Sequence, residues 1–205
     1  MADNYIESRM EELNSASVRK VANRPSLEGL MLFNRSTRRY DTSYSVHELQ
    51  LRAIVSVNSR IASTRNQQVL RFHLVLKDRA ALVIPHVRMG GSVPEAGFEP
   101  DAFIIICTSN PDARHYEFDE GIAAQSMLLK AAEMKLNGLI IKSFDADKVK
   151  EALGMELRPT TVIAVGRSAE KIVLEQVGAD AENLRYHIEN GIRTVPKIRW
   201  EDLIV

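Results

Sequence analysis

The sequence predicts an α/β fold in which a layered sheet carries helices on both faces. Segments with helical and strand patterns alternate along the 205 residues, which favours this class. Residues 102–108 form a continuously apolar run of strand length, as expected for a strand covered on both sides. Asn190-Gly191, between the apolar segments 184–188 and 192–195, predicts a hairpin. The sheet is therefore not expected to be purely parallel.

The composition fits one globular domain without a global charge. Hydrophobic residues make up 45% of the chain, enough for a core, and 27 basic residues balance 27 acidic ones. A neutral chain has no overall field that attracts nucleic acid or an anionic membrane, so any anion site has to be local. The N-terminus is polar and no apolar segment has the length of a membrane span, so we expect a cytoplasmic protein.

Cysteine and histidine usage gives no sign of a metal site. Cys107 is the only cysteine and lies in an apolar run, where we interpret it as a buried, unreactive thiol. The five histidines are scattered along the chain. The sequence also lacks the Walker, G-x-G-x-x-G, H-E-x-x-H and G-x-S-x-G motifs.

The N-terminal segment is predicted to be a helical extension. Residues 3–20 follow helical spacing loosely, and the prolyl segment 23–25 interrupts them. We therefore divide the chain into an extension, residues 1–25, and a domain, residues 26–205. Ser26 is expected to cap a short helix at the start of this domain.

A helix, a strand and a second helix are expected next. Residues 45–48 (Ser-Val-His-Glu) have the form of a capping box, and the helix behind it is expected to place five apolar residues on one face. These are Val46, Leu49, Ala53, Ile54 and Val57. Residues 69–76 alternate between apolar and polar types, which predicts a strand. Residues 78–89 are predicted to form a short helix that ends near Pro85.

The longest predicted helix lies within residues 112–137. Six residues are expected to share one of its faces: Phe118, Ile122, Gln125, Leu129, Ala132 and Leu136. The many small residues of this helix suit either a buried helix or a helix at a subunit interface. The tail, residues 195–205, ends on apolar residues, which predicts that it docks on its own body or on a partner.

Two further strands are predicted on either side of a short helix. Residues 139–141 form a short apolar run, and residues 161–165 a longer one. Between them, Asp145 is expected to cap a helix that ends at Gly154.

A cluster of hydrogen-bond donors is the main functional signal. Arg35, Ser36, Arg38 and Arg39 lie within five residues, and the donor fork of arginine matches phosphate oxygens. In isolation such a cluster also fits a solvated basic turn. No convincing nucleophile or general base accompanies these donors, which indicates that a bound cofactor carries the chemistry.

Four segments resemble, in order, motifs of the flavin-dependent nitroreductase family. Residues 34–40 resemble its opening R-R-S-x-R-x-F, and residues 62–72 resemble its P-S-A-x-N-x-Q-P-W-x-F. Residues 119–129 resemble its central helix, and residues 195–199 its closing P-K-x-R. The resemblance extends from about residue 26 to the C-terminus.

The resemblance implies a three-layer sandwich with a mixed central sheet, working as a homodimer whose C-terminal tails are exchanged between subunits. FMN would lie at the dimer interface. NADH or NADPH would reduce it, and a second acceptor, such as a nitroaromatic compound or a quinone, would accept the hydride in a ping-pong cycle. An FMN-binding or flavin-storage protein with little turnover is the alternative. Neutral net charge disfavours a third possibility, a structural or nucleic-acid-binding role for the arginines.

The resemblance also assigns roles to individual residues. Arg35, Ser36 and Arg38 would hold the phosphate and ribityl chain of FMN. Lys197 and Arg199 would close on the same phosphate. Four residues would contact the ring and ribityl chain from the partner subunit: Ser63, Thr64, Asn66 and Gln68.

Two departures from the family pattern affect these roles. Asn34 stands where the family usually has arginine, and Arg39 is expected to compensate for the lost charge. Lys142 and Ser143 lie in the segment whose backbone N–H would face flavin N5, where many relatives have Glu-Gly. A cation there would raise the flavin potential only if its side chain pointed at the ring.

Overall fold

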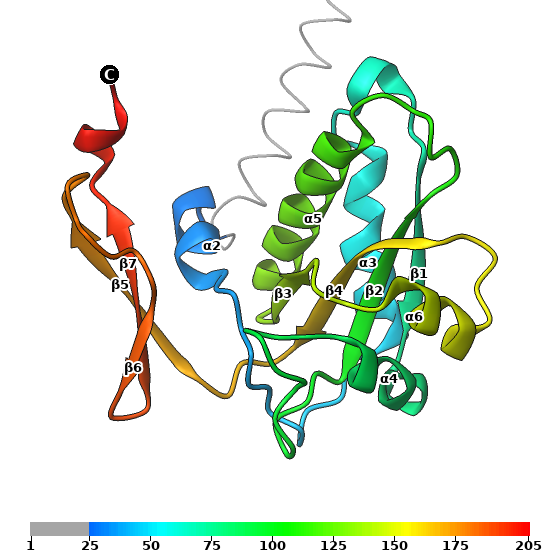
Figure 1. Cartoon of the computed structure of the whole chain (residues 1–205), viewed down its shortest axis with the longest axis horizontal. Helices are drawn as coiled ribbons and strands as arrows, with labels where there is room; N and C mark the ends of the chain where they lie inside the picture. Colours follow the sequence, from blue (N-terminus) through cyan, green and yellow to red (C-terminus); the bar gives the residue numbers. More distant parts are fainter. Residues whose placement is uncertain (1–24) are drawn as a thin grey trace, which may run out of the picture.

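A four-stranded antiparallel sheet lies between two layers of helices, and a smaller sheet extends beside this body (Figure 1). This computed structural model describes residues 25–205. The helices are α2 (Leu27–Phe33), α3 (Glu48–Val55), α4 (Lys77–Val83), α5 (Tyr116–Glu133) and α6 (Ala146–Leu153), with short 3-10 helices η1 (Ser56–Ser59), η2 (Thr64–Asn66), η3 (Ile84–His86) and η4 (Trp200–Leu203). The strands are β1 (Leu70–Val75), β2 (Ala102–Thr108), β3 (Asn137–Ile141), β4 (Pro159–Gly166), β5 (Lys171–Val177), β6 (His187–Glu189) and β7 (Ile192–Ile198).

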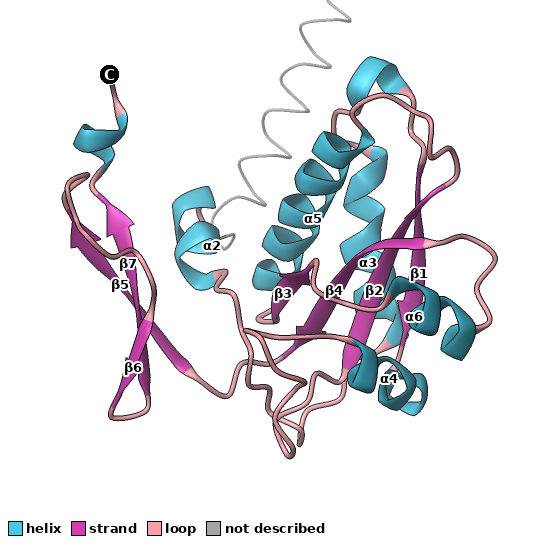
Figure 2. Ribbon diagram, in the orientation of Figure 1, coloured by secondary structure: helices cyan, strands magenta, loops and turns pink. Residues whose placement is uncertain are grey.

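The central sheet has the strand order β1-β2-β4-β3, and every neighbouring pair is antiparallel. Ile104 pairs with Leu74 on one side and with Ile163 on the other, which fixes the register of the central strands. All seven residues of β2 are buried, as expected for its apolar sequence. A strand with this burial requires helices on both faces, and Figure 2 shows them there.

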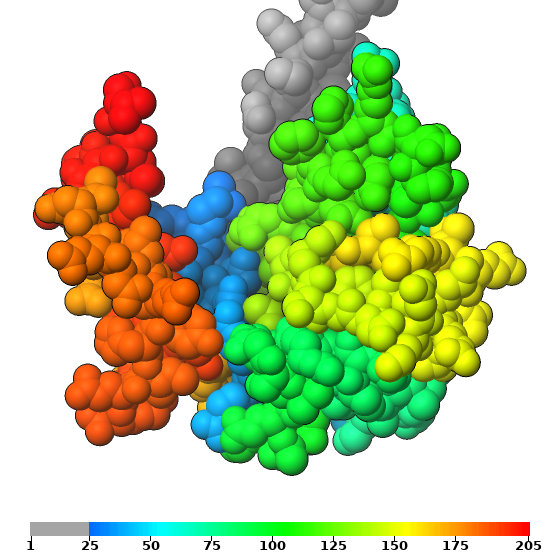
Figure 3. Space-filling view, in the orientation of Figure 1, coloured from blue at the N-terminus to red at the C-terminus, as the bar shows by residue number. Residues whose placement is uncertain are grey.

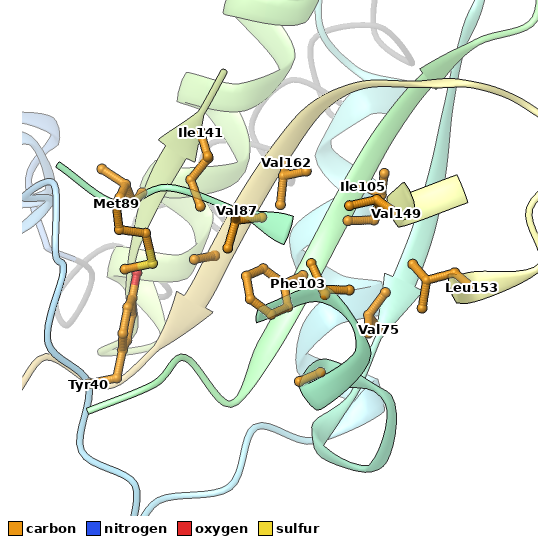
Figure 4. Packing of buried hydrophobic residues seen from close by; sticks show 14 of the residues in the cluster. Tyr40, Val75, Val87, Met89, Phe103, Ile105, Ile141, Val149, Leu153 and Val162 are labelled. Atoms are coloured by element: carbon orange, nitrogen blue, oxygen red, sulfur yellow. The ribbon is translucent and has the colours of Figure 1, made fainter. Parts of the chain in front are cut away.

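Alternate residues of β2 serve two separate cores. Phe103 and Ile105 belong to the core that faces α4 and α6, and Tyr40 lies beside Met89 at the other end of the same core (Figure 4). Ile104 and Ile106 face α3 and α5. This alternation is the two-residue period of a strand, and it explains why an unbroken apolar run is needed here.

The segment that follows α2 is attached to the free edge of β3. Ser36 forms a parallel bridge with Gly138, and the Thr37 N–H donates to the Gly138 carbonyl at 3.1 Å. Thr37 is fully buried, and the Tyr40 hydroxyl donates to its carbonyl at 2.9 Å. We call residues 34–39 the arginine loop. Its buried backbone anchor holds it against the sheet.

The smaller sheet, which we call the C-terminal ribbon (residues 171–198), has the order β5-β7-β6. β5 runs parallel to β7, and β6 and β7 form a hairpin whose turn residues Asn190 and Gly191 have φ of 49° and 76°. These left-handed values suit Asn-Gly, so the predicted hairpin is confirmed. The ribbon and the C-terminus stand beside the body (Figure 1).

The predicted fold class is confirmed, with one difference in the sheet. Within the chain the central sheet is antiparallel, and parallel pairing occurs between β5 and β7 and at the bridge to the arginine loop. The predicted strands at 69–76, 102–108, 139–141 and 161–165 are all present. β5 was not predicted, because its alternating burial leaves no continuous apolar run.

The helix caps were predicted with mixed success. Ser26 accepts from the Gly29 N–H at 3.0 Å, and Asp145 caps α6, which ends at a left-handed Gly154. The predicted capping box at residues 45–48 is wrong. The helix begins at Glu48, and the His47 N–H donates to the Gln50 side chain at 2.9 Å.

The buried faces of α3 and α5 also differ from prediction. In α3, Leu51 and Ile54 are buried while Leu49 is 79% exposed, because the helix packs with the face that carries Leu51 and Ile54. In α5, Phe118 is 69% and Ile122 41% exposed. The face of α5 that packs on the sheet instead carries small residues and Met127, because these allow a close approach to β2 and β4. Phe118 and Ile122 are left on its outer face.

The predicted helical extension, residues 1–25, lies outside the described residues except for Pro25. Among residues 25–205, no helix combines the length and the hydropathy needed to cross a membrane.

Replacing Gly138 with alanine tests the anchor of the arginine loop. An added Cβ would lie 2.5 Å from both the Ala164 carbonyl oxygen and Leu128 Cδ2. We expect Gly138→Ala to lower the free energy of unfolding by about 1–3 kcal/mol, because the backbone of β4 cannot move aside easily. Urea denaturation measures this change. Gly121→Ala is the matched control, since an added Cβ there meets no atom within 4 Å. Equal stability of wild type and Gly138→Ala would contradict the close packing.

Candidate functional site

A cavity of about 400 Å³ lies between the arginine loop, the edge of the body and the C-terminal ribbon. In Figure 3 the residues after position 25 (blue) lie between the ribbon (orange) and the body (green). The cavity is lined by Met31, Asn34, Arg35, Ser36, Arg38, Gln125, Leu128, Ile140, Ile172, Leu174, Tyr186, Val195 and Lys197. We call it the arginine cavity. It combines three cationic side chains with apolar walls.

Four predicted site residues meet in this cavity although they come from opposite ends of the sequence. Arg35, Ser36 and Arg38 line it from the arginine loop, and Lys197 lines it from β7. Asn34 lines it as well, at the position where the family usually has arginine. Three cations around one small volume form an anion-binding arrangement, and arginine is the side chain best suited to bidentate contact with phosphate.

Arg35 is held by the end of α2. Its Nε donates to the Leu32 carbonyl at 2.9 Å, and its Nη2 donates to the Met31 carbonyl at 2.5 Å. These bonds satisfy carbonyls at the helix C-terminus and fix the guanidinium in place. Partial burial lowers the pKa of Arg35 from its usual value, but an arginine remains charged. Its remaining N–H groups are available to a ligand.

Arg38 is oriented by three contacts. Its Nη1 donates to the Ser36 carbonyl at 3.0 Å, and its guanidinium lies over the ring of Tyr186, 5.0 Å from the centroid. Its backbone N–H donates to Glu170 Oε1 at 2.5 Å. The side chain is therefore positioned by the arginine loop and by the ribbon together.

A second, smaller cavity of about 170 Å³ lies beside the predicted amide and hydroxyl loop. Ser63 and Gln68 line it, together with Asp119 of α5. It shares no lining residue with the arginine cavity. Within one chain, the two groups of predicted cofactor contacts are thus in separate places.

The backbone of this loop is constrained. Arg65, Asn66 and Gln68 adopt left-handed φ of 51°, 55° and 48°. The backbone N–H and hydroxyl of Thr64 donate to Asp119 Oδ1 at 2.7 and 2.9 Å. Non-glycine residues with such φ are uncommon and cluster at binding sites, so the loop is preformed rather than adaptable.

The side chain of Lys142 is engaged by the body. Its Nζ donates to Glu120 Oε2 at 3.0 Å, to the Thr160 carbonyl at 2.7 Å and to Thr161 Oγ1 at 2.9 Å. The Glu120 side chain is 5% exposed and the Lys142 side chain is 62% exposed, so a buried carboxylate pairs with an ammonium group at the surface of the body. The Ser143 carbonyl accepts from the Arg88 N–H at 2.8 Å, which fixes the turn after β3.

Like Lys142 and Ser143, the predicted cofactor residues Arg39 and Arg199 do not line the arginine cavity. Arg39 lies over the ring of Phe98, 3.7 Å from the centroid, with Nε 3.1 Å from Glu95 Oε2. Arg199 pairs with Asp202 through Nε and Nη2 at 3.2 and 3.1 Å. Their assigned roles at the cofactor stay predictions.

Sequence reasoning missed several residues of the site. Glu170 and Tyr186 contact Arg38, but no local pattern marks either of them. Asp119 and Glu120 are buried acidic residues on an otherwise small-residue face of α5. Two adjacent carboxylates on the buried side of a helix could have been recognised as a signal for a polar cluster.

Cys107 and His73 have no sign of a catalytic role. Burial raises the pKa of the Cys107 thiol to about 11, which suppresses the reactive thiolate and confirms the predicted inert thiol. His73 is half-buried in β1, and burial lowers its pKa. Among residues 25–205, no group of three or more His, Cys, Asp or Glu side chains could hold a metal ion.

Comparison with known proteins identifies the fold. Residues 95–167 match the model of the Nitroreductase family. A search of curated protein sequences finds no match. An FMN-dependent nitroreductase from Clostridium difficile R20291 is similar over 80% of this chain and 99% of its own, with a TM-score of 0.62 and 19% identity.

Two other solved structures agree. A nitroreductase family protein from Streptococcus pneumoniae TIGR4 is similar over 71% of this chain and 92% of its own, with a TM-score of 0.58 and 19% identity. An FMN- and NADPH-dependent nitroreductase mutant from a Sphingopyxis strain is similar over 70% and 88%, with a TM-score of 0.59 and 16% identity. The four sequence motifs indicate a resemblance to the nitroreductase family. This resemblance is confirmed by the family match at residues 95–167 and by the nitroreductase fold of the described chain.

Proposed function

We propose that this protein is an FMN-dependent oxidoreductase that takes hydride from NADH or NADPH and passes it to a second acceptor in a ping-pong cycle. The observation that carries the proposal is the convergence of Arg35, Ser36, Arg38 and Lys197 on one cavity. Three positive charges around one small volume repel one another, and a bound anion would offset this repulsion. The nitroreductase fold gives this anion an identity, the phosphate of FMN.

The arginine cavity fits a ligand with a charged end and a less polar remainder. Its donors gather at the arginine loop and Lys197, and its other walls include Leu128, Ile140 and Ile172. A phosphate would use the donors, and the apolar walls would exclude water from the rest of the ligand. When bound, FMN would supply hydride acceptance and donation at its N5 atom. The protein's own residues bind, orient and shield.

A homodimer would complete the site. Ser63 and Gln68 line a separate cavity, so their proposed contact with FMN requires a second copy of the chain. Apolar side chains that such a copy could cover are exposed on α2, α5 and the tail: Leu27, Met31, Leu32, Phe118, Ile122, Trp200, Leu203 and Ile204. This surface supports exchange of the C-terminal tails, which would bury the last of these groups.

The turn after β3 would present its backbone to the cofactor, as the family resemblance implies. Lys142 does not act there as a free cation, because Glu120 neutralises its ammonium group. We therefore propose that this turn contributes through its backbone N–H rather than through the lysine charge. A cytoplasmic location, and nitroaromatics or quinones as acceptors, remain part of the proposal.

An FMN-binding or flavin-storage protein is the second candidate. Asn34 lines the arginine cavity where the family usually has arginine, so one positive charge that would face the phosphate is absent. Weaker or differently oriented FMN would then bind without efficient turnover.

Anaerobic reduction separates these functions. The purified protein, loaded with FMN, is mixed with NADH or NADPH while its visible absorbance is recorded. Bleaching of the flavin bands by either donor is the expected result, and the faster donor identifies the preferred nucleotide. A yellow protein that neither donor bleaches would favour storage. A protein that takes up no FMN would contradict both functions.

Arginine substitutions test the phosphate assignment. We expect Arg35→Ala and Arg38→Ala each to weaken FMN binding about tenfold or more, because each removes charge-assisted hydrogen bonds to the phosphate. Fluorescence titration of FMN measures the Kd. Arg52→Ala, which breaks an exposed ion pair with Glu48, serves as the control and should leave the Kd unchanged. Arg39→Ala reveals whether Arg39 contributes despite its position on Phe98. Wild-type affinity in both Arg35→Ala and Arg38→Ala would remove the assignment.

Subunit mixing tests whether the site is shared. Arg35→Ala damages the arginine cavity, and Asn66→Ala damages the loop proposed to reach the partner. In a mixed dimer, one site would carry both substitutions and the other neither. We expect co-refolded mixtures to recover tight FMN binding at about half the sites of the mixed dimers, because the intact loop and the intact cavity belong to different chains. Recovery is absent if each chain builds its own site, and that outcome would contradict the dimeric site.

A further inference from the structure

Glu170 is a buried carboxylate at the junction of the body and the C-terminal ribbon. Its side chain is 6% exposed. Oε1 accepts from the backbone N–H of Arg38 at 2.5 Å and lies 3.4 Å from that of Arg39. Oε2 accepts from Arg193 Nε at 2.9 Å. One carboxylate therefore contacts the arginine loop with one oxygen and β7 with the other.

The other groups around Glu170 extend the same junction. Arg193 is 5% exposed, and its guanidinium lies 4.4 Å from the centroid of the Tyr186 ring. Arg38 approaches the same ring at 5.0 Å, so Tyr186 contacts both guanidinium groups. Tyr186 also lines the arginine cavity. The segment before Glu170 is tied to the loop as well, since the Ala169 N–H donates to the Arg39 carbonyl at 2.9 Å.

The charge of Glu170 is poorly suited to a simple anion site. A carboxylate close to a phosphate site repels the phosphate, so its presence weakens anion binding unless it does something else. Its oxygens are used by backbone N–H groups of the loop and by a buried arginine. These contacts hold the loop in one conformation and neutralise Arg193, which would otherwise compete with the cavity for anions.

We infer that Glu170 is a positioning residue of the arginine cavity, which orders the backbone of Arg38 and thereby joins the C-terminal ribbon to FMN binding. The inference rests on the proposed function for the identity of the ligand. The ribbon supplies Arg193, Tyr186 and Lys197, and Glu170 directly precedes it, so ordering of the ribbon and binding in the cavity favour each other. Reciprocal coupling follows, so FMN would stabilise the ribbon to the same degree that the ribbon improves FMN affinity.

Glu170→Gln separates positioning from simple electrostatics. A glutamine side chain keeps the shape, but it places an NH2 donor where one of the two accepting carboxylate oxygens lies. That donor would face either the loop N–H or Arg193 Nε, so one of the two contacts is lost. Simple electrostatics predicts tighter FMN binding after the loss of a negative charge. Positioning predicts the opposite, and we expect the Kd for FMN to rise about tenfold. Glu175→Gln removes an exposed carboxylate from β5, the strand that directly follows Glu170, and is the matched control.

Hydrogen exchange in flavin-free protein supplies the second readout. We expect the Arg38 and Arg39 amides to exchange at least about tenfold faster in Glu170→Gln than in wild type or Glu175→Gln. Unchanged exchange at these amides would overturn the positioning role, whether or not the protein binds FMN. Failure of the wild type to bind FMN would by itself contradict only the proposed function. Unchanged or tighter FMN binding in folded Glu170→Gln would also overturn it.

Wild-type protein keeps the inference testable if Glu170→Gln does not fold. Addition of FMN should slow amide exchange in β5, β6 and β7 as well as in the arginine loop. Protection confined to the loop would overturn the coupling between ribbon and cavity.

Discussion

The arginine loop can serve as an anion site because buried, uncharged groups attach it to the sheet. The Thr37 N–H bonds to the Gly138 carbonyl, and the Tyr40 hydroxyl bonds to the Thr37 carbonyl inside the core. Burial, together with the charge of Glu170, raises the pKa of Tyr40, so this anchor stays neutral at any physiological pH. The anchor therefore does not depend on the guanidinium groups beside it, and Arg35 and Arg38 remain available to the cavity.

Glycine at position 138 is a condition for this attachment. The backbone of Ala164 and the side chain of Leu128 leave no room for a Cβ, so β3 packs close to β4 and α5 while its outer edge bonds to the loop. The small buried residues of α5 belong to the same arrangement, since they bring that helix close to the sheet. Close packing on the inner side of α5 leaves Phe118 and Ile122 on its outer side. One packing solution thus creates both the arginine cavity and the apolar surface proposed for a second subunit.

The sequence predicted the parts of this structure that local chemistry determines. Apolar runs located the central strands, Asn190-Gly191 located the hairpin, and Ser26 and Asp145 located helix starts. The prediction that Arg35 and Arg38 lie together with Lys197 came from the family resemblance, because no local pattern connects residues so far apart. The predictions that failed concern features that tertiary packing determines. Which face of α5 is buried depends on how closely the sheet approaches, and the role of Glu170 depends on contacts with Arg38 and Arg193, which lie far from each other in the sequence.

The measurement that tests the account most directly is an experimental structure of the protein with bound FMN. The account predicts a dimer in which the phosphate contacts Arg35, Ser36, Arg38 and Lys197 of one chain, while the loop containing Ser63 and Asn66 of the other chain reaches the same ligand. Phosphate density outside the arginine cavity, or a complete site within a single chain, would contradict it.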